Sequence, residues 1–138
     1  MEQCYYRVSV KGIVIDDDGR ILLSLEDNGK WEMLGGGLDH NEDPIDGLKR
    51  EIFEETGLTT TYISPNPRYF ITTTRVDTAV PIYVANVIYE IKLENLDFTT
   101  SDECQELRFF SLKEMKEVPL FPNVQKLLDI LEQERTDS

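Results

Sequence analysis

The sequence is poor in basic residues. Lysine and arginine together number 14 against 27 aspartates and glutamates, which gives a formal net charge of −13 over 138 residues. A groove for a nucleic-acid polymer needs a concentrated basic face, so this charge balance argues against one. A small polyanionic substrate would also be repelled unless metal ions and local arginine or lysine residues screened its charge.

Cysteine and histidine are scarce as well. The two cysteines, Cys4 and Cys104, lie far apart and form no paired motif. Disulfide frameworks and zinc sites that can be read from a sequence need more numerous or closely spaced cysteines, so both are expected to be reduced. The only histidine, His40, is interpreted as a loop residue without a role.

Long apolar runs are missing too. No stretch approaches the roughly 20 apolar residues of a membrane span, and the first ten residues lack the basic and apolar segments of a signal peptide. We therefore expect a soluble cytoplasmic protein that does not associate with membranes. The length suits a single domain, residues 1–138, and no repeat or linker divides it.

The sequence does contain one stretch that carries several helix-boundary signals and clustered acidic residues, GGLDHNEDPIDGLKREIFEETGL, at residues 36–58. Asp43 followed by Pro44 is typical of a helix start, with a capping side chain and a proline at the first helical position. Gly57 is typical of the residue just past a helix end, where glycine adopts the left-handed conformation cheaply. The stretch therefore predicts a helix over residues 44–56.

Three acidic residues share one face of that helix. Glu51, Glu54 and Glu55 stand at positions i, i+3 and i+4, and their mutual repulsion costs about a few tenths of a kcal/mol per pair. A cation is expected there, and hard oxygen ligands suit Mg²⁺ or Mn²⁺. The apolar residues expected to face the core lie about a quarter turn away: Ile45, Leu48 and Ile52.

An acidic triplet on an exposed helix is more often a solvated face than a metal site. The residues around this triplet favour the metal site, because a glycine run, Glu42 and Arg50 stand in register with both helix boundaries. The full spacing is Gly-x5-Glu-x7-Arg-Glu-apolar-x-Glu-Glu-x-Gly-apolar. Its nine fixed positions are Gly36, Glu42, Arg50, Glu51, Ile52, Glu54, Glu55, Gly57 and Leu58.

This spacing resembles the Nudix box, the signature of hydrolases that act on nucleoside diphosphates linked to another group. The resemblance implies an α/β fold, an α/β/α sandwich with a mixed β-sheet. Three neighbouring positions depart from the family's usual residues: Leu34 replaces a proline before the glycines, Asp39 replaces a glutamate, and Asn41 replaces a glycine. These departures concern the loop and leave the reaction class unchanged.

The implied reaction is attack of water on phosphorus within a diphosphate, with Mg²⁺ as cofactor and Mn²⁺ able to substitute. A (deoxy)nucleoside triphosphate pyrophosphohydrolase is the favoured activity, and a nucleotide-sugar or dinucleoside polyphosphate hydrolase is the alternative. A non-catalytic Nudix-fold binding module is a further alternative. Loss of box carboxylates would be its sequence mark, and none is lost here. The substrate is expected to be a small nucleotide-like molecule, and a homodimer is possible.

The resemblance also implies roles for individual residues. The metal ligands are expected to be Glu51, Glu54 and Glu55, together with the backbone carbonyl of Gly35 or Gly36. Arg50 is expected to orient the carboxylates, and Glu42 to brace the loop against the helix, while Gly36 and Gly57 shape the motif.

A further acid from outside the box is expected to complete the metal site or to act as the base. The segment SDECQELRFF offers Glu103 and Glu106, and Glu103 is preferred because of its place before the final strand. The candidates for substrate contact are chosen by residue type, arginine for phosphates and aromatic residues for stacking on a base: Arg68, Arg75, Tyr69, Phe70 and Tyr83. Such aromatic residues are more often part of a core.

The rest of the chain reads as strands, a turn and two helices. Strands are predicted at residues 6–16, 31–34, 69–76, 80–93 and 107–110, and a turn at 16–20 suggests a hairpin with the following apolar run. Ser111 and Glu114 form a capping-box pattern that opens a short helix. Apolar residues from Val124 to Leu131 recur at helical spacing and predict a C-terminal amphipathic helix.

Overall fold

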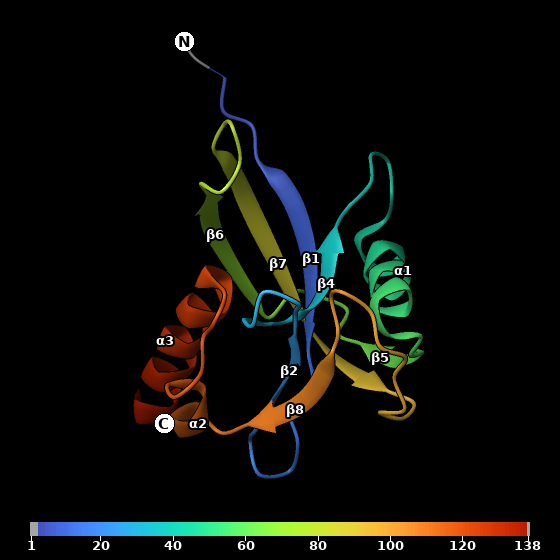
Figure 1. The fold of residues 1–138 in the computed structure, drawn as a ribbon, viewed down its shortest axis with the longest axis vertical. Coiled ribbons are helices and arrows are strands. Elements are labelled where there is room, and N and C mark those ends of the chain that lie inside the picture. The colour runs from blue at the N-terminus through green and yellow to red at the C-terminus, as the bar shows by residue number, and fades with distance from the viewer. Residues whose placement is uncertain (1–2, 138) are drawn as a thin grey trace.

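Two helices lie on opposite sides of a central β-sheet in the computed structural model, which describes residues 3–137 (Figure 1). The helix on one side is α1, and α3 lies on the other, as the α/β/α prediction requires. The helices are α1 (Pro44–Thr56), α2 (Leu112–Met115) and α3 (Pro122–Asp137).

The central sheet is mixed. Its strands follow the order β4 (Leu34–Gly37), β1 (Arg7–Ile13), β7 (Ile82–Leu93) and β5 (Thr60–Ile63), and β6 (Tyr69–Arg75) also pairs with β7. Strands β1 and β7 run parallel, whereas the other pairs run antiparallel. A second sheet, absent from the sequence-based expectation, is antiparallel and has the order β3 (Trp31–Glu32), β2 (Ile21–Leu25) and β8 (Glu106–Phe110).

Both faces of the central sheet are buried at its middle. Along β1 the side chains alternate, so that Val10 packs in the cluster beneath α1 and Ile13 packs in the cluster beneath α3. Leu48 and Ile52 of α1 are fully buried in the first cluster, and Ile45 packs against it, as predicted. This packing fixes α1 and its acidic face against the edge of the sheet formed by β4.

The boundaries of α1 are those that the sequence predicts. The Asp43 side chain caps the first turn by accepting hydrogen bonds from the backbone N–H groups of Ile45 and Asp46, at 2.9 and 3.4 Å. At the other end Gly57 has a φ of 74°, and its N–H donates to the carbonyl of Phe53 at 2.8 Å. Local chemistry alone thus sets the start and the end of the helix.

The predicted hairpin after β1 is only partly confirmed. Its turn is present, since the N–H of Asp16 donates to the carbonyl of Arg20 at 3.0 Å. The flanking chains pair only briefly, through a bridge between Ile15 and Ile21, and then enter different sheets. The single strand expected at 31–34 is likewise divided at Met33, between β3 and β4. One segment therefore connects the two sheets.

Most other elements agree with the sequence. The strands predicted at 69–76, 80–93 and 107–110 appear as β6, β7 and β8, with ends shifted by one or two residues. The capping box at the start of α2 is present, with Ser111 and Glu114 bonding each other's backbone. Strand β5 was not predicted. Among the described residues, no helix is long and apolar enough to cross a membrane.

Candidate active site

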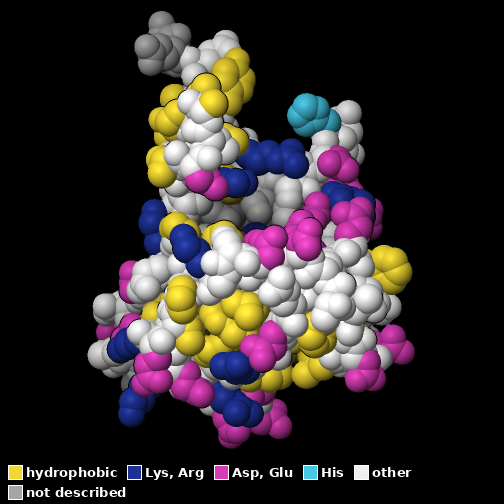
Figure 2. Space-filling view, viewed as in Figure 1, with side chains coloured by type: hydrophobic (Ala, Val, Ile, Leu, Met, Phe, Trp, Pro, Cys, Tyr) yellow, Lys and Arg dark blue, Asp and Glu magenta, His cyan; other side chains and the backbone are white. Residues whose placement is uncertain are grey.

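The acidic face of α1 lines a cavity of about 250 Å³. The opposite wall comes from the loop before β8, some 50 residues further along the chain. The cavity's lining residues are Glu51, Glu54, Glu55, Ser101, Asp102 and Glu103. Figure 2 shows a hollow in the upper half of the molecule, with acidic side chains gathered along one side and Lys and Arg side chains at its margin.

Two hydrogen bonds hold the loop before β8 at this place. The Ser101 hydroxyl donates to the carbonyl of Glu55 at 2.7 Å, and the N–H of Asp27 donates to the carbonyl of Asp102 at 2.9 Å. The loop is thereby fixed to the end of α1 and to the end of β2. As a result Glu103 lines the cavity, whereas Glu106 lies on β8 and pairs with Arg108 at 2.9 Å.

Glu55 is the most deeply buried of the acidic residues in the cavity, with 4% of the residue exposed. Its Oε1 accepts the backbone N–H of Gly35 at 2.8 Å. Burial raises the pKa of Glu55 to about 9, with the Glu103 carboxyl adding to the rise and Lys11 opposing it. A carboxyl in this environment is neutral at pH 7 unless a further cation approaches it.

Glu51 lies directly against the glycine strand. A Cβ atom at Gly36 would stand 2.5 Å from Glu51 Oε2, so a side chain at this position would displace the Glu51 carboxylate. Burial raises the pKa of Glu51. Glu54 is the outermost of the three box carboxylates, with 57% of its side chain exposed. The three carboxylates thus share one helix face but differ in their access to solvent.

Arg50 connects the loop to the acidic face. Its Nε and Nη2 donate to the two carboxylate oxygens of Glu42, at 2.8 and 2.9 Å, and Nη2 also reaches the carbonyl of Gly37 at 3.2 Å. Its Nη1 lies 3.0 Å from Glu51 Oε1 and 3.2 Å from Glu54 Oε2. These contacts are those expected of a residue that orients carboxylates.

Gly35 presents both of its backbone polar groups to the site. Its N–H reaches Glu55, and its carbonyl accepts from Lys11 Nζ at 3.0 Å. Gly36, the other glycine expected to offer its carbonyl to a metal, lies opposite Val10 in the ladder with β1, and its role as a ligand stays a prediction. The backbone contact to the carboxylates is therefore made by Gly35, and Gly36 contributes the space for Glu51.

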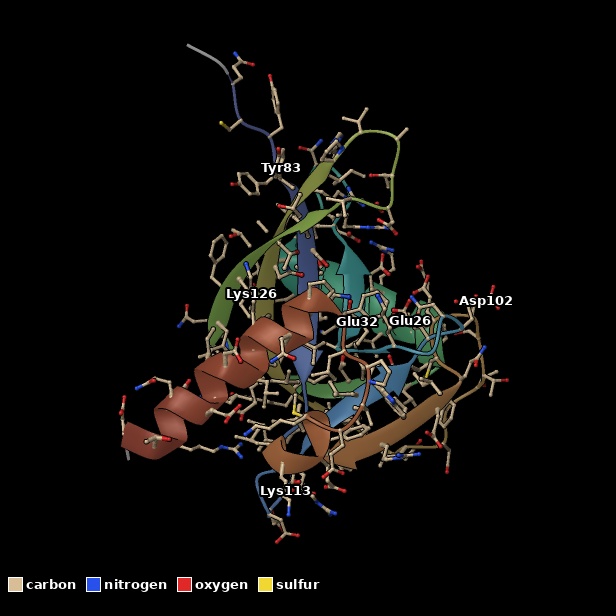
Figure 3. The ribbon with its side chains drawn as sticks, turned by 60° about the vertical axis from the view of Figure 1, so that its left-hand side comes forward. Glu26, Glu32, Tyr83, Asp102, Lys113 and Lys126 are labelled. Carbon is tan, nitrogen blue, oxygen red and sulfur yellow. The ribbon has the colours of Figure 1, made fainter. Side chains whose placement is uncertain are left out.

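The sequence did not single out a buried charge cluster behind the cavity. Lys11 and Glu32 are each 7% exposed, and Lys11 Nζ lies 3.7 Å from Glu32 Oε2. Burial raises the pKa of Glu26 to about 7, and Glu32 contributes to that rise. Figure 3 shows Glu26 and Glu32 beside each other, on the same side of the molecule as Asp102. The available signal was a lysine inside the otherwise strand-like RVSVKGI.

The donor set fits a hard divalent cation in chemical kind, because the side chains that line the cavity offer only oxygen atoms. Within residues 3–137, however, no three His, Cys, Asp or Glu side chains converge on a common point. The reason is visible in their contacts. Arg50 binds Glu51 and Glu54, and the Gly35 N–H binds Glu55. A bound cation would compete with these partners for the same oxygens.

The residues expected to contact substrate do not line this cavity. Arg68 pairs with Glu90 at 3.4 Å, and Arg75 pairs with Asp77 at 3.4 Å. Strand β6, which carries Arg75, lies beside α3, across the sheet from α1 (Figure 1). These contacts give neither arginine a position at the carboxylates.

The aromatic candidates are placed similarly. The Tyr69 hydroxyl lies 3.1 Å from Glu134 of α3, and Phe70 is exposed beside α3. Tyr83 is half exposed and lies against the ring of Tyr6, near the N-terminal end of the described chain (Figure 3). Their assignment as substrate contacts, like that of the two arginines, stays a prediction.

Comparison with known proteins connects this geometry to a family. The NUDIX domain family model matches residues 5–131. The chain belongs to the Nudix family. In the solved MutT protein from Methanosarcina mazei, 22% identical, the same fold recurs with a TM-score of 0.76, covering 94% of this chain and 95% of that one.

Curated relatives match part of this Nudix chain. A MutT-like protein from Streptomyces ambofaciens is 48% identical over 54 residues, which is 38% of this chain and 35% of that protein. An RNA pyrophosphohydrolase from Bartonella henselae is 31% identical over 75 residues, 47% of this chain and 43% of that protein. The match thus spans less than half of either relative's length.

Proposed function

We propose that this Nudix protein is a metal-dependent pyrophosphohydrolase that hydrolyses a diphosphate bond in a nucleoside triphosphate or deoxynucleoside triphosphate. The observation that carries the proposal is the meeting of Glu103 with the three box carboxylates in one cavity. With Asp102, five carboxylates line this one small space and repel one another, and a divalent cation is the natural way to relieve that repulsion. An exposed acidic face without function would not need two further acids from a distant loop.

The residues that would hold Mg²⁺ or Mn²⁺ are Glu51, Glu54 and Glu55, through their carboxylates. Such a metal supplies charge neutralisation at the phosphoryl oxygens and a lowered pKa for water. Arg50 keeps Glu51 and Glu54 oriented through its contacts at 3.0 and 3.2 Å.

Glu103 stands beside the buried Glu55 and is proposed to take up the proton that the attacking water releases. Glu103 is suited to this work because it lines the cavity opposite the expected metal ligands and comes from a different segment of the chain. The role distinguishes Glu103 from a residue that only adds negative charge.

The word pyrophosphohydrolase in the name of one relative supports hydrolysis of a pyrophosphate bond. A nucleotide sugar or a dinucleoside polyphosphate is the alternative. A 5′-triphosphorylated RNA is a further possibility because of the relative from Bartonella henselae, but the net charge of −13 disfavours a long polyanion. The cytoplasmic location and a homodimer remain expectations from the sequence.

The first experiment is a panel of nucleoside triphosphates, nucleotide sugars, dinucleoside polyphosphates and a short 5′-triphosphorylated RNA, with Mg²⁺ or Mn²⁺. Release of phosphate and pyrophosphate is measured for the wild type and for a Glu54→Gln, Glu55→Gln double variant. We expect metal-dependent turnover that the double variant loses, while the exposed control Glu94→Gln keeps it. A ligand that raises the melting temperature without being hydrolysed would support the binding-module alternative instead.

Glu103 and Glu106 form a matched pair for the second experiment, since both are glutamates of the same segment and only Glu103 lines the cavity. Glu103→Gln is expected to lower turnover at least about tenfold with an unchanged melting temperature. Glu106→Gln is expected to leave turnover unchanged. Near-normal turnover in Glu103→Gln would rule out the role proposed for it.

A further inference from the structure

Arg7 occupies the space that a side chain at Gly37 would fill. The guanidinium of Arg7, from β1, lies so close above Gly37 that a Cβ atom there would collide with Arg7 Nη2. Its Nη1 donates to the carbonyl of the next residue, Leu38, at 2.8 Å. The three glycines of β4 thus carry no side chains, and β1 supplies a cationic group across them.

Side chains of opposite charge, from other elements, lie over two neighbouring glycines on the two faces of β4. Successive residues of a strand point to opposite faces. A Cβ at Gly36 would meet the carboxylate of Glu51, and a Cβ at Gly37 would meet the guanidinium of Arg7. Arg7 therefore lies across the glycine segment of a single strand from Glu51, one of the carboxylates that line the cavity.

The spacing along β4 suits a phosphate chain. The N–H of Gly35 donates to Glu55, and the guanidinium of Arg7 lies over Gly37. These two glycines are two residues apart along β4. Two residues of extended strand span roughly 6.5 Å, a length that a di- or triphosphate chain covers. Because β4 is the end strand of the central sheet, a phosphate chain that passes over its outer edge would meet the carboxylates on one face and Arg7 on the other.

Arg7 also has the charge and the exposure that such contact requires. Arg7 is exposed, and its hydrogen bond to the Leu38 carbonyl leaves further N–H donors of the guanidinium available. No carboxylate among residues 3–137 lies within ion-pair distance of it, although the chain has a net charge of −13. Arginines of this chain with such a partner include Arg20, Arg50, Arg68, Arg75 and Arg108.

Lys11, a second cationic residue of β1, is buried and has partners for its charge. It lies on the same face of β1 as Arg7, two alternations further on, but it is 7% exposed. Its ammonium group is taken up by the Gly35 carbonyl at 3.0 Å and by Glu32 at 3.7 Å. Lys11 is therefore a fixed part of the structure, whereas Arg7 presents an available cation.

We propose that Arg7 is a substrate-binding residue that holds a phosphoryl group of the substrate adjacent to the one at the carboxylates. The planar guanidinium suits two oxygens of one phosphate. The ligand class is the oxyanion of a di- or triphosphate chain, and the base or sugar at its end is not specified. The proposal rests on the proposed function, because it takes the carboxylates as the place of the metal-bound phosphoryl group.

The kinetic test uses Arg7→Gln and Arg7→Lys on the substrate that the panel identifies. Lys113→Gln is the charge-matched control, since Lys113 is exposed on α2, far from Glu26 and Glu32 (Figure 3). For Arg7→Gln we expect KM to rise about tenfold or more while kcat changes less than twofold. Arg7→Lys should recover part of the loss, and the control should match the wild type.

The same variants separate binding from a purely structural role. If Arg7 serves only to anchor the loop at Leu38, its loss would disturb the carboxylates, so that kcat would fall while KM stayed constant. That result would overturn the proposal. Melting temperatures show which variants fold, and if Arg7→Gln does not, Arg7→Lys carries the test because it keeps the charge and loses the planar fork.

A second measurement does not depend on turnover. Methylenediphosphonate, a diphosphate analogue that cannot be hydrolysed at its bridging carbon, is titrated calorimetrically into each variant with Mg²⁺ present. Arg7→Gln is expected to bind it about tenfold more weakly than the wild type and the Lys113→Gln control. Unchanged affinity would overturn the role of Arg7. Weakened affinity in a protein that hydrolyses nothing in the panel would support Arg7 and reject the proposed hydrolase.

Discussion

Arg50 holds both carboxylate oxygens of Glu42, with Nε–Oε2 and Nη2–Oε1 separations of 2.8 and 2.9 Å. The Arg50 side chain is 29% exposed and that of Glu42 only 17%, so the pair is partly shielded from solvent. Because the remaining nitrogen of the guanidinium reaches Glu51 and Glu54, one side chain fixes the loop and two carboxylates together.

Replacing Arg50 by lysine keeps the charge but removes the planar fork that makes these contacts simultaneously. We expect Arg50→Lys to lower kcat/KM about 10- to 100-fold, as is typical when a residue that orients metal ligands is lost. The matched control is Arg20→Lys, which alters another arginine–carboxylate pair, at 2.7 Å from Asp16. Equal activity of the two variants would contradict the orienting role.

The Glu42–Arg50 pair should contribute to stability only above acidic pH. The hydrogen bond from Arg50 lowers the pKa of Glu42 to about 2 from its ordinary value of 4.5. A depressed folded-state pKa gives stability that is full above about pH 4.5 and is lost as the pH falls towards 2. Urea unfolding at a series of pH values should therefore show Glu42→Gln less stable than the wild type at pH 7, with the difference disappearing near pH 2.

Glu26 should have the opposite effect. Burial, followed by the charge of Glu32, raises the pKa of Glu26 to about 7 from 4.5. The folded state then binds this proton more tightly than the unfolded state, so stability is lost as the pH rises from about 4.5 to 7. Glu26→Gln is expected to raise the melting temperature at pH 8 and to leave it unchanged below pH 4.5. A melting temperature of Glu26→Gln below that of the wild type at pH 8 would contradict this prediction, because it would show that ionised Glu26 stabilises the folded state.

Gly47 is the glycine inside α1, where helix propensity alone favours alanine by about 1 kcal/mol. An added Cβ would stand 2.5 Å from Leu38 Cδ1 and 2.8 Å from Glu42 Oε1. Because Arg50 holds Glu42 with two bonds, this carboxylate cannot move away cheaply. We therefore expect Gly47→Ala to lower the melting temperature. Lys49→Ala, at an exposed position of the same helix, gives the effect of propensity without the collision.

The comparison of sequence and structure separates local from long-range information. Strand β5 (Thr60–Ile63) was missed because its residues, Thr-Thr-Tyr-Ile, do not alternate between apolar and polar. The structure agrees, since Thr61 and Tyr62 are both exposed. The split between β3 and β4 was missed because a run of three glycines gives no sign of which sheet it joins. The residues expected to bind substrate were chosen by type alone, and their role stays a prediction, because Arg68 contacts Glu90 and Tyr69 contacts Glu134 rather than the cavity.

By itself the sequence determined the helix α1, its caps and the shared face of Glu51, Glu54 and Glu55, because these depend on backbone geometry within a few residues. Only the tertiary structure decided that Glu103 rather than Glu106 joins them and that Arg7 covers Gly37. Arg7 and Leu38 are 31 positions apart, and Ser101 and Glu55 are 46 apart. Such contacts follow from how strands pair and loops are held, which the spacing of residues along one element does not encode.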